Sequence, residues 1–110
     1  MRQILIDQLS REERVNIESY LKRTMRPGPL SGIYWVEVPR DLLSGDQLAH
    51  KECGPYFFAV ELADESVTFE LLIRSQSNLH CSCIAYASPA QREFVLRLVD
   101  RMLEEERIRA

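Results

Sequence analysis

The chain has 110 residues, of which 45% are hydrophobic and 28% are charged, and its formal net charge is −3 at pH 7. This length suits a single domain, here residues 1–110, and the balanced composition excludes collagen-like, disordered and coiled-coil rod classes. Because no apolar run approaches ~20 residues and the chain is mildly acidic, we expect neither a membrane nor a nucleic-acid partner. The start Met1–Asp7 is too short and too soon acidic for a secretory signal, so we expect a cytoplasmic protein.

A first helix is indicated by Ser10 followed by Glu13, the spacing of a capping box. Apolar residues then recur along one side of a 3.6-residue wheel, with Val15 off that side. The run Arg26-Pro27-Gly28-Pro29 ends the helix, because proline cannot continue it. Residues 1–9 fit either a short strand or an arm.

Four strands are predicted after this helix, joined by short polar turns. Val67 to Arg74 shows the clearest alternation, with Val67, Phe69, Leu71 and Ile73 on one face. Connections of about four residues favour antiparallel pairing, because parallel strands need a crossover of a dozen residues or more. The predicted strands cover Ile33 to Val38, Tyr56 to Leu62, Val67 to Arg74 and Leu79 to Ala87.

A last helix begins at Ser88-Pro89-Ala90-Gln91, which combines a serine cap, proline at the first helical position and glutamine at the third. The predicted fold class is therefore α+β: a two-layer sandwich in which an N-terminal and a C-terminal helix cover one face of a four-stranded antiparallel sheet. This order of elements is similar to those of the double-stranded-RNA-binding domain and the frataxin group. The similarity covers element order only and implies no function.

Cysteine and histidine gather in two places, and together they offer a zinc-ligand set made of His50, Cys53, Cys81 and Cys83. Against this alternative, residues two apart in a flat strand lie roughly 6.6 Å apart, too far for two thiolates on one zinc ion. The simpler interpretation places Cys81, Cys83, Ala85 and Ala87 as small buried residues under the helices. An odd cysteine count also argues against a disulfide scaffold.

The far face of the sheet, which two helices cannot cover, offers the second candidate site. It is predicted to carry a mixed apolar patch, and such patches usually mark partner or self-association surfaces. The predicted sheet region, residues 33–88, carries a net charge of −5, whereas residues 1–32 carry +2. An acidic sheet argues against binding of nucleic acid, whose phosphates attract basic surfaces. The predicted interface residues are Phe57, Leu72, Ile84 and Tyr86.

No catalytic motif is present, and the favoured hypothesis is a small, non-enzymatic interaction or regulatory domain without a cofactor. It binds a protein partner or a second copy of itself, as a homodimer, through the open sheet face. The alternative is a small zinc-binding protein. A third hypothesis places a ligand pocket between the sheet and the irregular segment from Arg40 to Cys53, because long loops in compact domains are often functional.

Overall fold

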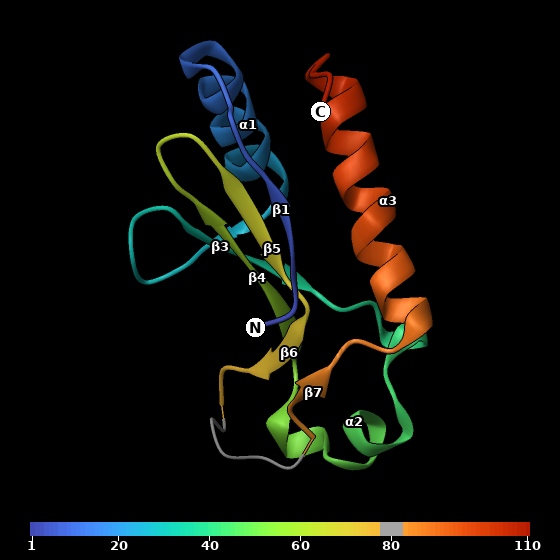
Figure 1. Cartoon of the computed structure of the whole chain (residues 1–110). Coiled ribbons are helices and arrows are strands. Elements are labelled where there is room, and N and C mark those ends of the chain that lie inside the picture. Colours follow the sequence, from blue (N-terminus) through green and yellow to red (C-terminus); the bar gives the residue numbers. More distant parts are fainter. Residues whose placement is uncertain (78–82) are drawn as a thin grey trace.

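The computed structural model describes residues 1–77 and 83–110 and has an α+β fold with a mostly antiparallel open sheet (Figure 1). Four strands were predicted, and this number is wrong: the described residues contain seven. The N-terminal residues, the segment after the first helix and a break in one predicted strand supply the difference. In chain order the elements are β1 (Gln3–Ile6), α1 (Arg11–Thr24), β2 (Arg26–Pro27), β3 (Ile33–Glu37), a 3₁₀ turn (Arg40–Leu42), α2 (Gly45–Ala49), a 3₁₀ turn (Lys51–Cys53), β4 (Tyr56–Leu62), β5 (Val67–Glu70), β6 (Leu72–Ser75), β7 (Ala85–Tyr86) and α3 (Pro89–Glu105).

The main sheet has the strand order β1-β5-β4-β3-β2, and β6 joins it by pairing with both β4 and β7. Each of these pairs is antiparallel. Residues 1–9, which the sequence left open between strand and arm, thus supply a strand at one edge of the sheet. The predicted strand from Leu79 to Ala87 is reduced in the described residues to β7, since 78–82 lie outside them.

The predicted strand Val67–Arg74 is split at Leu71 into β5 and β6. Leu71 N–H donates to the carbonyl of Arg2, and its own carbonyl accepts from Ala87 N–H. The pairing with β4 also shifts there: Val60 lies opposite Phe69, whereas Phe57 lies opposite Arg74, two positions beyond the register of β5. Because side chains alternate with period two, this shift leaves the same set facing the core.

Each of the three α-helices in the described part of the chain begins with a capping box. The predicted boxes at Ser10 and Ser88 are confirmed, and Pro89 stands in the first turn of α3. The third box begins α2, where the Ser44 side chain accepts from Gln47 N–H and the Gln47 side chain accepts from Ser44 N–H. This short helix was not predicted as one element, although its Ser-x-x-Gln spacing is that of a capping box.

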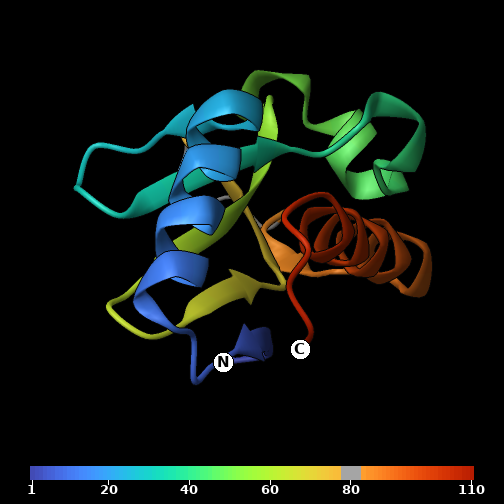
Figure 2. The same cartoon turned by 90° about the horizontal axis from the view of Figure 1, so that it is seen from above.

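The core lies between the sheet and the two long helices. Ile4, Phe69, Val60 and Tyr34 stand opposite one another along the sheet and define the face that we call the core face. Seen from above, α1 and α3 lie over different parts of the sheet, and α2 lies beyond its end (Figures 1 and 2). The core side chains of the two long helices are Ile17, Tyr20 and Leu21 of α1 with Val95, Val99 and Met102 of α3.

The C-terminal ends of α1 and α3 meet in an ion pair. Arg23 Nη2 lies 3.0 Å from Glu106 Oε2, just beyond the end of α3. Beside this pair, Tyr20 is 2% exposed; its burial raises the pKa of its hydroxyl, and the charge of Glu105 adds to the rise. Among the described residues no helix combines the length and apolar character needed to cross a membrane.

Candidate interaction surface

The structure places the predicted zinc ligands in different settings. His50 ends α2, and its Nδ1 lies 2.7 Å from the carbonyl oxygen of Asp46. Cys53 is 1% exposed, and its carbonyl accepts from the hydroxyls of Ser75 and Ser77. Cys83 is buried and disulfide-bonded, although the odd cysteine count argued against a disulfide scaffold. Cys81 lies outside the described residues.

Within residues 1–77 and 83–110, no three His, Cys, Asp or Glu side chains gather in a group able to hold a metal ion. The zinc site stays a prediction. The interpretation of the small residues as core is confirmed for Cys83 and Ala87, which are 2% and 5% exposed, but Ala85 is exposed.

The far face of the sheet, opposite the core face, includes Leu5, Trp35, Ala59 and Thr68. Phe57 lies on it as alternation predicts, yet its side chain is completely buried. Trp35 meets its ring edge-on with centroids 6.1 Å apart, and the Arg26 guanidinium lies 5.3 Å from the ring centroid. Phe57 is therefore covered by its own chain.

Trp35 lies close to the turn that follows β2. A Cβ added at Gly28 would lie only 2.8 Å from Trp35 Nε1, so glycine is needed for this approach. The indole Nε1 is buried and has no hydrogen-bond partner among the described residues.

Charged side chains of both signs occupy much of the far face. Arg26 pairs with Glu37 at 3.2 Å and Arg74 pairs with Glu70 at 3.0 Å. The members of the first pair are more than half exposed. Ion pairs this exposed add little stability, and they divide the apolar surface into smaller areas.

The other three predicted interface residues lie together at one corner. Leu72 stands opposite Tyr86 in the β6–β7 pair, and Ile84 directly precedes β7. The Arg2 guanidinium lies 4.7 Å from the Tyr86 ring centroid, and the Tyr86 hydroxyl lies 3.6 Å from Met1 Sδ. This corner therefore adjoins the start of β1.

Strand β1 pairs with β5 along one side, and its other side is a sheet edge in the described structure. The Arg2 carbonyl accepts from Leu71 N–H and so points toward the sheet. Successive residues of a strand direct their polar backbone groups to opposite sides, so those of Gln3, Leu5 and Asp7 point outward. The Leu5 side chain is 50% exposed.

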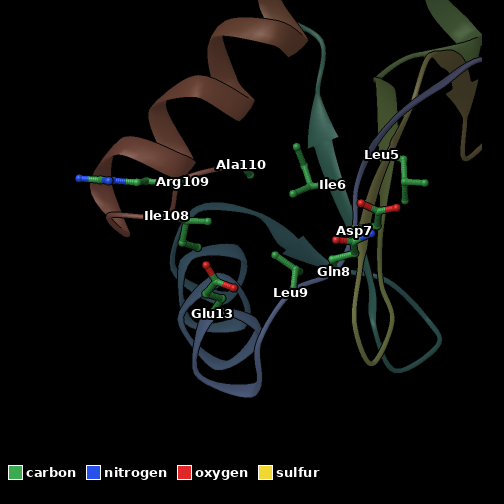
Figure 3. A pocket seen from close by; sticks show the side chains of 9 residues that line it. All are labelled: Leu5, Ile6, Asp7, Gln8, Leu9, Glu13, Ile108, Arg109 and Ala110. Carbon is green, nitrogen blue, oxygen red and sulfur yellow. The ribbon is translucent and has the colours of Figure 1, made fainter.

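A groove of about 330 Å³ follows the C-terminal half of this edge, between β1 and the residues after α3 (Figure 3). Ile6, Leu9 and Ile108 supply its apolar part. Asp7 and Glu13 add carboxylates, whereas the Arg109 side chain points away (Figure 3). An unpaired edge beside a partly apolar, acidic groove is suited to binding another strand.

The sequence analysis did not identify this edge. The signal in the sequence is the alternation of Ile4 and Ile6, which face the core, with Gln3, Leu5 and Asp7.

Comparison with known proteins adds no family: no protein-family model, no curated protein and no solved structure matches the chain.

Proposed function

We propose that this chain is a non-enzymatic interaction domain that binds a second copy of itself, and that the two copies pair antiparallel along the edges of their β1 strands. The observation that carries the proposal is the outer edge of β1, which has no partner strand in the described structure. Two antiparallel copies of this strand place compatible residues opposite each other. Pairing of this kind continues the sheet from one copy into the next and gives a two-fold symmetric dimer.

The register follows from the outward-pointing groups. With the two-fold axis at Leu5, Leu5 lies opposite Leu5 of the second copy, and Gln3 lies opposite its Asp7. These are hydrogen-bonded pairs, because each of the three residues directs its backbone N–H and C=O outward. The Gln3 amide then also reaches the Asp7 carboxylate, so the pairing joins complementary side chains.

The same register brings Ile6 opposite Ile4 of the second copy, on the core side of the strand. There the second copy enters the groove lined by Ile6 and Ile108. The chain bends at Gln8, whose φ is 55°, so the ladder ends at the Gln3–Asp7 pair and Arg2 of the second copy continues past it toward the part of the groove that Glu13 lines. Apolar contact and opposite charge therefore coincide along the same line.

The predicted interface residues then stand at the rim of the dimer. Tyr86 is in contact with Arg2 and Met1, which lie at the start of the pairing strand. Leu72 and Ile84 flank Tyr86 and are half-buried. Phe57 makes no contact with the second copy in this arrangement, because Trp35 and Arg26 of its own chain cover it.

The test is light scattering after size exclusion over a range of concentrations. We expect a concentration-dependent dimer that is lost in Leu5→Lys, since two ammonium groups then face each other across the axis. Leu96→Lys is the matched control, because Leu96 is 44% exposed and belongs to α3 instead of the sheet. Hydrogen exchange at the Leu5 and Asp7 amides should slow as the dimer forms.

Two outcomes would overturn the proposal. The first is a monomer at every concentration. The second is a dimer that Leu5→Lys leaves intact while Leu72→Glu dissociates it, since this result places the contact on the far face instead of the edge.

A further inference from the structure

The segment from Arg40 to Cys53 forms one wall of a second cavity, of about 400 Å³, whose other wall comprises the end of β3 and the start of β4. Apolar side chains form most of its surface, and Arg40 and Lys51 bring the cationic groups. Its principal apolar residues are Val38, Leu43, Leu48 and Tyr56. The volume falls in the lower part of the range found for small-molecule sites, roughly 300–1,000 Å³.

Gln47 is the buried polar group of this cavity, with 3% of the residue exposed. Both hydrogen bonds of its side chain end on Oε1, which accepts from Ser44 N–H at 2.9 Å and from Gln91 Nε2 at 3.1 Å. Two donors on one atom fix the orientation of the amide. In the part of the chain that the structure describes, the Nε2 group donates to no acceptor.

The amide is held in place by α3 as well as by its own helix. Gln91 Nε2 also donates to the Leu42 carbonyl at 2.8 Å, and Gln91 Oε1 accepts from Ser88 N–H at 2.9 Å. Gln91 is itself 2% exposed. A rigid donor on a supported element is the kind of group that orients a bound ligand.

The cations at the cavity are available for a ligand. Neither Arg40 nor Lys51 belongs to any ion pair among the described residues. Glu37, the one carboxylate among the lining residues, is paired with Arg26. On the opposite wall the Tyr56 hydroxyl donates to the His50 carbonyl at 2.9 Å. Burial raises the pKa of the Tyr56 hydroxyl, so this group stays neutral at physiological pH.

We propose that this cavity binds a small carboxylic acid with an apolar body. The carboxylate accepts from Gln47 Nε2 and pairs with Arg40 or Lys51, while the apolar body packs on Val38, Leu43 and Leu48. A fixed amide donor at one end, cations beside it and an aliphatic wall together match an anionic head and a short tail. This site does not depend on the self-association proposed above.

The test uses the ¹⁵N-labelled full chain titrated with hexanoate, observed by NMR. We expect saturable shifts of the Gln47 side-chain amide and of backbone amides around the cavity, and weaker binding of the neutral analogue hexan-1-ol. Gln47→Glu keeps an oxygen for Ser44 and Gln91 but replaces the donor, so hexanoate affinity should fall by about tenfold or more.

Arg40→Gln and Lys51→Gln, both at exposed positions, test the cations without touching the buried amide. Together they should weaken hexanoate binding, whereas Lys22→Gln on α1, the matched lysine control, should not. This pair of variants decides the matter even if Gln47→Glu does not fold. The proposal is overturned if hexanoate leaves the Gln47 amide unshifted, if hexan-1-ol binds as tightly, or if Lys22→Gln acts like Lys51→Gln.

Discussion

On the core face of the sheet, apolar side chains of neighbouring strands meet α1 and α3, whereas on the far face apolar, polar and charged side chains share the surface. Phe69 and Phe57 make the contrast concrete, since they are 1% and 0% exposed on opposite faces. Phe69 is buried within the core cluster, which includes side chains of both long helices, but Phe57 is in contact with a tryptophan and an arginine. Equal burial therefore arises from a dense core on one side and from a thin cover on the other.

The first way to test this contrast is to truncate the core face. Phe69→Ala should reduce the free energy of unfolding by about 4 kcal/mol, because a ring packed on all sides leaves a cavity that the helices cannot fill. Urea unfolding measures the change. Thr68→Ala, the adjacent far-face position, is the control and should cost no more than about 1 kcal/mol. Equal losses at the two positions would contradict the assignment of the faces.

The core face could be predicted because burial repeats along each strand. Val67, Phe69, Leu71 and Ile73 all lie in the core, as their alternation indicates. Two serine-capped helices were found for a similar reason, since a capping box is a local signal.

The far face was harder to predict, because what covers it comes from elsewhere in the chain. Arg26–Pro27 looks like a helix stop followed by a turn, yet it pairs with β3 and brings Arg26 over Phe57. The exposure of Phe57 was therefore overestimated. The edge at β1 was also missed, because four residues with one alternation do not reveal which neighbour they pair with. The length of the segment from Arg40 to Cys53 predicted where the cavity beside α2 lies, but not which side chains line it.

Truncating Phe57 tests whether a thin cover stabilises as much as a core. Phe57→Ala should cost about 3 kcal/mol, the low end of the range for buried phenylalanine, because Arg26 and Trp35 can move toward the space. Urea unfolding again gives the value, with the quenching of Trp35 fluorescence as a local probe. A loss as large as that of Phe69→Ala would show that the cover is as rigid as the helices.

The smallest effect concerns the cover itself. Arg26 both pairs with Glu37 and lies on the Phe57 ring, while Glu37 does only the first. Glu37→Gln should therefore cost less than about 0.5 kcal/mol, and Arg26→Gln about 0.5 kcal/mol more than that, since a cation on an aromatic ring at an exposed site adds roughly 0.5–1 kcal/mol. Raising the salt concentration should diminish the loss in Glu37→Gln more than the loss in Arg26→Gln. The exposed ion pair is screened by ions, whereas the contact with the ring also excludes water.

A double-mutant cycle, measured by urea unfolding, separates the ion pair from the contact with the ring. The exposed pair Arg97–Glu93 on α3, replaced by glutamine in the same way, is the reference for an ion pair without an aromatic partner. If Arg26→Gln matches Arg97→Gln, the cover of Phe57 owes nothing to the arginine, and Trp35 alone buries the ring.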